Sequence, residues 1–237
     1  MHLSDKTILI TGAAGGLGAA LTRQCASDGA DLVLLDKNRR ALTALSDSLT
    51  GEGFKPPGLY PLDLAGAGVE DYNQLADTIR SEFGGLHALV HCALAFEGLQ
   101  PLDQIEPHRW LQSIQVNVNA PWLMSCTLLP LLKEAENGRL FFMLDDLDRV
   151  TGAYWGAYGT GKAALAGLVR QFHASLSNTE VIVKGINPGA MRTNFRALVY
   201  HAENPLEQPE PGIVAGRIAG LLTGKIPNED PMLVFSR

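Results

Sequence analysis

Short apolar runs alternate with longer helical patterns along the whole of this 237-residue chain, and this alternation limits the fold more than any other feature. Strands and helices that alternate at this spacing predict a parallel, doubly wound α/β sheet inside a three-layer αβα domain. The length suits one such domain over residues 1–237. The expected strands are residues 7–10, 31–36, a strand ending at 62–64, 88–92, 139–144, 181–186 and 232–235. The expected helices are residues 16–28, 39–49, 70–83, 107–133, one through Tyr158 and Lys162, and 213–222.

A glycine-rich turn follows the first expected strand and leads into the first helix, with the sequence Thr11-Gly12-Ala13-Ala14-Gly15-Gly16-Leu17-Gly18. Glycines let the backbone approach a pyrophosphate closely, and a helix N-terminus offers free N–H groups and a partial positive charge. A glycine cluster alone is weak evidence, but here a strand precedes it and a helix follows, as the motif requires. We therefore expect a Rossmann fold whose dinucleotide phosphates lie at Gly12, Gly15, Gly16, Leu17 and Gly18.

The second expected strand ends on an acidic residue, Asp36, 18 positions after Gly18. A carboxylate at about this distance can accept hydrogen bonds from the ribose hydroxyls of a dinucleotide. It would repel a 2′-phosphate, so Asp36 favours NAD over NADP. Lys37, Arg39 and Arg40 follow at once and could pair with such a phosphate, so NADP stays an alternative. The other interpretation of Asp36 is a turn residue or helix N-cap at the end of a strand.

A tyrosine and a lysine, Tyr158 and Lys162, stand four positions apart in a stretch whose pattern predicts a helix. Their side chains would therefore share one face. A phenol exchanges protons poorly near neutral pH because its pKa is about 10, and a neighbouring ammonium favours the phenolate and lowers that pKa. The pair predicts an acid/base site, although two surface residues that happen to share a face are the alternative.

These ordered motifs, which span essentially the whole chain, resemble those of the short-chain dehydrogenase/reductase family. Besides the glycine turn and the Tyr158/Lys162 pair, the resemblance rests on Asp63-Leu64, on Asn117 in Val-Asn-Val-Asn, and on Pro188-Gly189-Ala190-Met191-Arg192-Thr193. It implies an oxidoreductase that transfers a hydride between a nicotinamide cofactor and a small carbonyl or alcohol compound.

The resemblance also implies roles for single residues. Tyr158 would be the general acid/base, and Lys162 would hold the nicotinamide ribose and lower the Tyr158 pKa. Asn117 would support a proton-relay water. Further cofactor contacts would come from Asp63 and Leu64 at the adenine, from Ala93 after the fourth strand, and from Pro188, Gly189 and Thr193 beside the nicotinamide.

Two positions depart from the family pattern, both at the edge of the sheet where the ligand is expected. The family has a Ser about 13 residues before the Tyr, to hydrogen-bond the substrate oxygen, and this chain has Asp145 there. An ionised carboxylate only accepts hydrogen bonds, so it would repel charge on a carbonyl oxygen and raise the Tyr158 pKa. The second departure is Cys92-Ala93-Leu94 in place of Asn-Ala-Gly, which adds bulk where a Gly lets the cofactor approach.

Asp145 leaves the function open between two classes. A protonated Asp145 could donate a hydrogen bond and serve catalysis, or its charge could bind a cationic part of the substrate. As a strand-end turn residue, Asp145 would instead mark a catalytically impaired dinucleotide-binding protein with a sensing or assembly role. A Rossmann-type methyltransferase is less favoured, because it assigns no role to Tyr158 and Lys162.

The segment 193–211 is the longest irregular stretch, and its prolines and length predict a mobile substrate lid. Trp155 and Phe195 could line the substrate pocket or serve only in packing. His91 lies in an apolar strand and is expected to be a satisfied core residue rather than a base.

Net charge and cysteine content limit the classes of partner and the cellular setting that we expect. A net charge of −6 argues against nucleic-acid binding. Cys25, Cys92 and Cys126 form no disulfide or zinc pattern, so we expect no metal and a cytoplasmic setting. Residues 111–132 carry no charge but include Asn, Gln and Pro, which predicts a buried helix and no membrane association. Family analogy alone suggests a homodimer or homotetramer.

Overall fold

Seven parallel strands form the central sheet of the computed structural model, which describes residues 2–224, 226 and 229–235. The strand order is β3-β2-β1-β4-β5-β6-β7, and every neighbouring pair is parallel. The order reverses between β1 and β4, which creates a crevice for ligands at the carboxyl edge. The strands are β1 (Thr7–Thr11), β2 (Asp31–Asp36), β3 (Gly58–Pro61), β4 (Ala88–His91), β5 (Arg139–Met143), β6 (Ile182–Asn187) and β7 (Met232–Val234).

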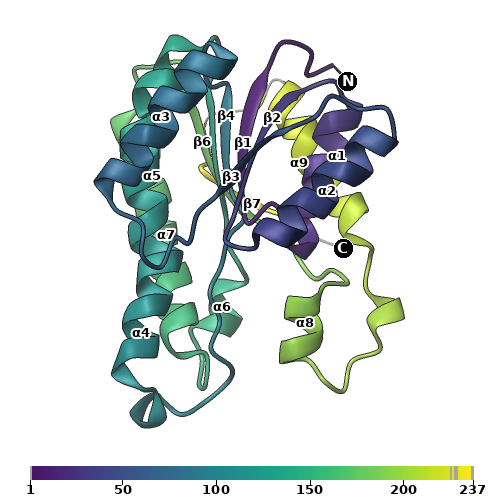
Figure 1. Cartoon of the computed structure of the whole chain (residues 1–237). Helices are drawn as coiled ribbons and strands as arrows, with labels where there is room; N and C mark the ends of the chain where they lie inside the picture. The colour runs from purple at the N-terminus through teal and green to yellow at the C-terminus, as the bar shows by residue number, and fades with distance from the viewer. Residues whose placement is uncertain (1, 225, 227–228, 236–237) are drawn as a thin grey trace.

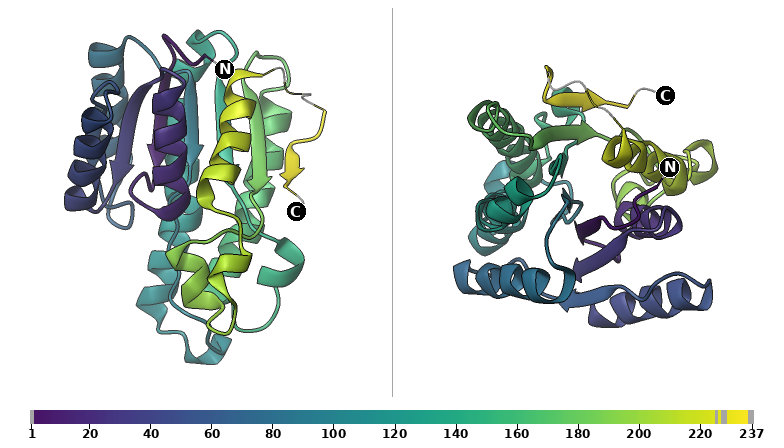
Figure 2. Two further views of the ribbon diagram at one scale, coloured as in Figure 1. Left: turned by 90° about the vertical axis from the view of Figure 1, so that its right-hand side faces the viewer. Right: turned by 90° about the horizontal axis from the view of Figure 1, so that it is seen from above.

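Helices cover both faces of the sheet and complete a three-layer, single-domain α/β architecture, as the sequence predicts (Figures 1 and 2). One face packs against α3 (Val69–Phe83), α5 (Ala120–Glu134) and α7 (Gly156–Ser175). The other face packs against α1 (Gly16–Ser27), α2 (Arg39–Gly51) and α9 (Pro211–Thr223). Among the described residues, no helix combines the length and the apolar character needed to cross a bilayer.

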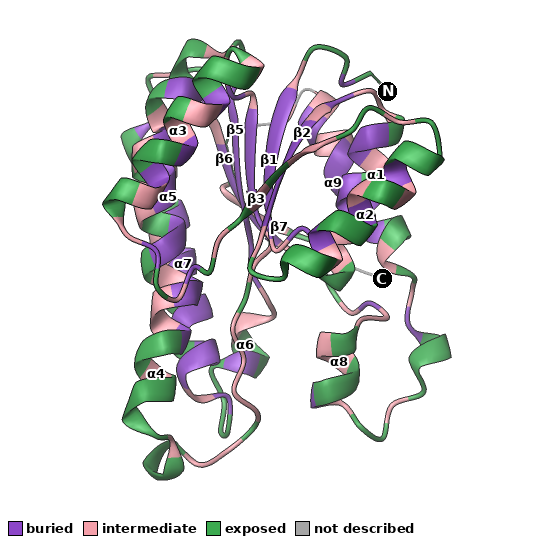
Figure 3. Cartoon of the chain, viewed as in Figure 1, coloured by how far each residue is buried: buried purple, intermediate pink, exposed green. Residues whose placement is uncertain are grey.

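The middle of the sheet is the core of the protein (Figure 3). Strands β1, β4 and β5 are buried along their whole length. Because helices cover both faces, the inner positions of these strands are all apolar, and polar residues stand only at the strand ends. The edge strand β3 alternates between half-buried and exposed residues. The strands whose carboxyl ends border the crevice are therefore held in place by packing on both faces of the sheet.

Local structure differs from the sequence prediction at three places. The third strand ends at Pro61 rather than at 62–64, because Asp63 turns the chain and its Oδ1 accepts a hydrogen bond from the Ala65 N–H at 3.0 Å. The helix expected over 107–133 is α4 (Pro107–Ile114), a π-helical turn η2 (Gln115–Asn119) and α5. Pro121 has no N–H to donate to the preceding turn, which accounts for the widened winding there.

The third difference concerns the stretches below the sheet in Figure 1. A short helix, α6 (Leu147–Val150), follows β5 where no element was expected. The segment 193–211 is not wholly irregular, because it contains α8 (Asn194–Val199) and the 3-10 turn η3 (Pro205–Glu207). Thr193 begins α8 by accepting a hydrogen bond from the Arg196 N–H at 3.2 Å. Both short helices lie beyond the carboxyl ends of the strands, next to the crevice.

Candidate active site

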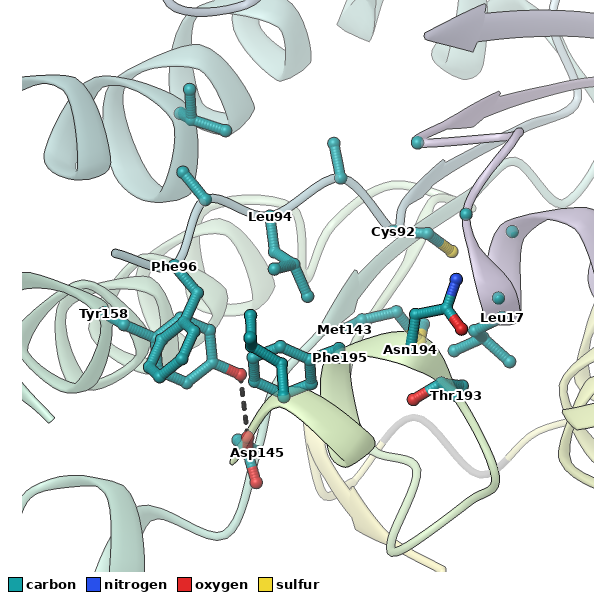
Figure 4. A pocket seen from close by; sticks show the side chains of 18 of the residues that line it. Leu17, Cys92, Leu94, Phe96, Met143, Asp145, Tyr158, Thr193, Asn194 and Phe195 are labelled. Atoms are coloured by element: carbon teal, nitrogen blue, oxygen red, sulfur yellow. Dashed lines mark hydrogen bonds between the residues drawn. The ribbon is translucent and has the colours of Figure 1, made fainter. Parts of the chain in front are cut away.

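A cavity of about 600 Å³ lies at the carboxyl edge of the sheet (Figure 4). Loops that follow six of the strands contribute to its lining, so segments far apart in sequence meet there. Of the residues predicted from the sequence to bind the cofactor, all line this one cavity: Gly12, Gly15, Gly16, Leu17, Gly18, Asp36, Asp63, Leu64, Ala93, Lys162, Pro188, Gly189 and Thr193. Tyr158 and Asp145 also line it, whereas Asn117 does not.

The glycine turn forms a tight bend at the N-terminus of α1. Gly12 has φ +63°, and a Cβ there would lie 2.7 Å from the Ala93 backbone, so the ends of β1 and β4 pack without side chains between them. A Cβ at Gly18 would lie 2.1 Å from the Gly12 carbonyl oxygen. Gly15 gives α1 no side-chain cap, so the first-turn N–H groups remain available to an anion. These features fit a dinucleotide pyrophosphate.

Asp36 ties the end of β2 to the glycine turn. Its Oδ2 accepts a hydrogen bond from the Ala14 N–H at 3.1 Å, and its Oδ1 accepts one from the Asn38 N–H at 2.9 Å. The N-cap of α2 is Asn38 and not Asp36. Lys37 lines the cavity beside Asp36. Arg39 and Arg40 follow at the start of α2; both are exposed, and neither lines the cavity.

Tyr158 and Lys162 share a face of α7, as their spacing predicts, but they do not act on each other as expected. The Tyr158 hydroxyl donates a hydrogen bond to Asp145 Oδ2 at 2.7 Å (Figure 4). Lys162 Nζ donates to the Met143 carbonyl oxygen at 2.7 Å and lies 5.5 Å from the centre of the Tyr158 ring. Lys162 therefore binds the end of β5 rather than the phenol oxygen.

The electrostatics of the pair follow from burial. Burial lowers the pKa of Lys162 to about 8. Burial, and after it the Asp145 carboxylate, raises the pKa of Tyr158 well above its ordinary value of 10.0. The Asp145 carboxylate therefore raises the pKa of Tyr158, as the sequence predicts, and the group that opposes this rise is Arg149.

Asp145 is surrounded by donors. Besides Tyr158, its carboxylate accepts hydrogen bonds at Oδ1 from the Asp146 N–H at 2.7 Å and from the Arg149 guanidinium at 3.0 Å. The Asp145 side chain is 15% exposed, so the carboxylate keeps some access to water. Three donors around one carboxyl group are the arrangement of an ionised acceptor. A protonated Asp145 that donates to the substrate does not match these contacts.

Aromatic rings enclose Tyr158. The ring centres of Phe96, Trp155 and Phe195 lie 5.5, 5.8 and 5.4 Å from the centre of the Tyr158 ring. Phe195 comes from α8, so the segment predicted to be a lid contacts the phenol directly. Trp155 and Phe195 thus line the cavity and also pack, which combines the two interpretations that the sequence left open.

The same segment also covers the glycine turn. A Cβ at Gly16 would lie 2.7 Å from the Thr193 Cγ2 atom, which shows how closely Thr193 approaches α1. At the other end of α8, the Tyr200 ring lies under two guanidinium groups, with Arg149 at 5.5 Å and Arg196 at 4.4 Å from its centre. Arg149 thereby joins Asp145 to the 193–211 segment.

Sequence reasoning missed Arg149 and Tyr200. The four-residue spacing between Asp145 and Arg149 was a usable signal, because oppositely charged residues at this spacing meet when the chain is helical. No local pattern pointed to Tyr200. Its hydroxyl is buried and has no hydrogen-bond partner among the described residues, although Tyr200 lines the cavity. A polar group of a ligand would satisfy this oxygen.

The loop after β4 contains the second departure from the family pattern. The Leu94 side chain points into the cavity in Figure 4 and is 39% exposed. Asn117 holds this loop from below, because its Oδ1 accepts from the Ala95 N–H at 3.1 Å and its Nδ2 donates to the Ala95 carbonyl oxygen at 2.8 Å. Asn117 is 1% exposed and does not itself line the cavity, but its two hydrogen bonds hold the backbone of the loop that does.

His91 is a satisfied core residue, as expected. Its Nε2 lies 2.9 Å from Ser125 Oγ, and its ring stacks on Phe142 with the ring centres 4.9 Å apart. Burial lowers the pKa of His91 to about 3, so the ring is neutral and does not enter the cavity chemistry. In the part of the chain that the structure describes, no group of three or more His, Cys, Asp and Glu side chains could hold a metal ion.

Comparisons with known proteins agree with this geometry. A family model described as short chain dehydrogenase matches residues 6–204. The uncharacterized oxidoreductase YciK of Escherichia coli K12 is 33% identical over 209 residues, which is 88% of this chain and 82% of YciK. A short-chain dehydrogenase structure from Pseudomonas syringae is 36% identical, with a TM-score of 0.92 over 98% of this chain and 94% of that one. A short-chain dehydrogenase from Shigella flexneri 2a, complexed with NADP, is 30% identical, with a TM-score of 0.92 over 98% of this chain and 97% of that one.

Proposed function

This chain belongs to the short-chain dehydrogenase family of oxidoreductases, and from that premise we propose that it transfers a hydride between a nicotinamide dinucleotide and a small alcohol or carbonyl compound. The observation that carries the proposal is the single cavity that brings the glycine turn, Tyr158 and Lys162 together. The dinucleotide supplies the hydride chemistry when it is bound, and the protein supplies position and electrostatics.

The residues of the cavity suit both ends of such a cofactor. The uncapped first turn of α1 would bind the pyrophosphate, with Asp63 and Leu64 at the adenine end. Pro188, Gly189 and Thr193 would lie at the nicotinamide end, where Lys162 is available to the ribose. The substrate would meet Tyr158 under the Phe96, Trp155 and Phe195 rings, with the 193–211 segment as its lid.

NADP is at least as well supported as NAD. Asp36 favours NAD by charge, but both of its oxygens already accept hydrogen bonds from backbone N–H groups. Lys37 beside it offers a positive charge at the cavity rim, and the relative from Shigella flexneri was crystallised with NADP. These observations support binding of NADP as well as NAD, although Asp36 alone favours NAD.

Assembly into a homodimer or homotetramer is part of the same proposal. Leu111 on α4 and Trp122 on α5 are 67% and 47% exposed, which supports burial of these helices against another copy. The size of the assembly follows from family analogy alone.

Fluorescence titration of the protein with NADPH and NADH tests the cofactor site. We expect saturable binding that Gly18→Ala abolishes, because the added Cβ would lie 2.1 Å from the Gly12 carbonyl oxygen. Gly167→Ala is the matched control, since a Cβ there meets no atom within 4 Å. Wild-type protein that binds neither dinucleotide would refute the proposed function. Binding without turnover of any alcohol or carbonyl compound would favour the catalytically impaired dinucleotide-binding protein.

A further inference from the structure

We propose that Asp145 is the terminal proton acceptor of this site in alcohol oxidation, receiving the proton of Tyr158 as Tyr158 takes the proton of the substrate hydroxyl. The inference rests on the proposed function and concerns the one position where the chain departs most from its family, because an acceptor stands where the family has a hydroxyl donor. A relay of this kind gives the Asp145 carboxylate a chemical role and accounts for its hydrogen bond with Tyr158.

The direction of the hydrogen bond is the first argument. A phenol has one O–H donor, and the Tyr158 proton is already committed to Asp145 Oδ2 at 2.7 Å. A substrate that reaches the Tyr158 oxygen therefore meets its lone pairs and must itself donate. An alcohol has a hydroxyl proton to donate, whereas a carbonyl oxygen has none. The ground-state geometry thus selects the alcohol as the partner of Tyr158.

The second argument is the fixed orientation of the acceptor. Asp145 Oδ1 is held by the Asp146 N–H at 2.7 Å and by Arg149 at 3.0 Å, so Oδ2 stays aimed at the phenol. Arg149 in turn lies 5.5 Å from the centre of the Tyr200 ring, on the segment that covers the cavity. The 15% exposure of the Asp145 side chain gives the acquired proton a route to water.

The proton and electron balance closes with these groups and an oxidised nicotinamide cofactor. A bound oxidised nicotinamide would take the electron pair of the substrate C–H bond as hydride, and the alcohol carbon would become a carbonyl carbon. The substrate O–H proton moves to the Tyr158 oxygen, and the original Tyr158 proton moves to Asp145 Oδ2. Tyr158 is neutral before and after the step, Asp145 becomes a carboxylic acid, and it then releases one proton to water.

The charged surroundings explain why a relay is preferable to a free phenolate. Tyr158 is faced by Asp145 beyond β5, by Arg149 on α6, by Lys162 on α7 and by Tyr200 beyond α8. Burial and Asp145 raise the pKa of Tyr158, and Arg149 offsets only part of this. Transfer of the phenol proton to Asp145 in the same step avoids the costly charge on the phenol oxygen. By microscopic reversibility, carbonyl reduction would use the same relay in reverse and would start with the proton on Asp145.

The first test needs no substrate. The ultraviolet titration of Tyr158 is obtained from wild type minus Tyr158→Phe, and again from Asp145→Asn minus Asp145→Asn/Tyr158→Phe. Asparagine keeps the shape of the side chain but removes its charge, so we expect Tyr158 to ionise at a lower pH in the Asp145→Asn background. Equal titration of Tyr158 in the two backgrounds would overturn the proposal, because the carboxylate would then not be coupled to the phenol.

The second test uses 1-phenylethanol and NADP⁺ as probes, because the pocket is aromatic. We expect Asp145→Asn to lower kcat/KM for oxidation about 100-fold or more while the Kd for NADPH is unchanged. Asp145→Glu should restore part of the rate, and Asp148→Asn, an exposed acid in the same run, should have no effect. Equal oxidation by wild type and Asp145→Asn overturns the relay but leaves the proposed function standing. Failure of the wild type to bind a dinucleotide overturns the proposed function itself.

Discussion

Acidification should destabilise this protein through one buried imidazole, that of His91, which ends β4 just before the cavity loop. The residue is 3% exposed, its Nε2 lies 2.9 Å from Ser125 Oγ, and its ring stacks on the ring of Phe142. Burial lowers its pKa from 6.5 to about 3. The folded protein therefore keeps His91 neutral over a pH range in which the unfolded chain already binds a proton there.

The sign and size of the effect follow from proton linkage. Below the unfolded value of 6.5 the unfolded state binds more protons at this site, so the free energy of unfolding falls as the pH falls towards the folded value of about 3. One pH unit over this range is worth about 1.4 kcal/mol. Between about pH 7.5 and about pH 5, His91 alone should remove about 2 kcal/mol from the free energy of unfolding.

Urea denaturation at these two pH values measures the loss, and His91→Gln is the reference. Glutamine does not titrate and can still reach Ser125, so the variant should lose about 2 kcal/mol less than the wild type over the same interval. The pKa of His87 is also lowered, by burial and by Lys6, but His87 is present in both proteins and cancels in the difference. An equal loss in the two proteins would show that His91 is protonated in the fold and would refute the reasoning.

Two further predictions concern the cofactor. Leu94→Gly should tighten NADPH binding by about tenfold, or about 1.4 kcal/mol, because it removes a side chain that points into the cavity. Fluorescence titration measures the Kd, and Leu102→Gly is the exposed control. An unchanged or larger Kd for Leu94→Gly would contradict this. Lys37→Ala should weaken NADPH binding about fivefold, about 1 kcal/mol, and leave NADH binding unchanged, because only NADPH has the 2′-phosphate. Equal losses for the two dinucleotides would argue against contact between Lys37 and that phosphate, and Lys133→Ala serves as the exposed control for charge removal.

The layered architecture and most of the residues that line the cavity could be predicted from the sequence, although Arg149 and Tyr200 were not. Apolar runs of strand length, separated by helical patterns, are local features, and burial between two helical layers makes them continuous. The glycine turn could be placed because a strand before it and a helix after it are both visible in the sequence. The four-residue spacing of Tyr158 and Lys162 was enough to put both on one helix face.

The interactions among these groups depend on contacts between segments that are distant in the sequence. Tyr158 donates to Asp145, 13 positions away, and Lys162 donates to the Met143 carbonyl oxygen, so the phenol proton is directed by a carboxylate and not released by an ammonium. Residue spacing along a helix cannot reveal such partners, because they lie at the end of a neighbouring strand. The approach of Thr193 to Gly16 is likewise invisible in the sequence. Side chains compete for partners in three dimensions, and burial decides which charges they keep.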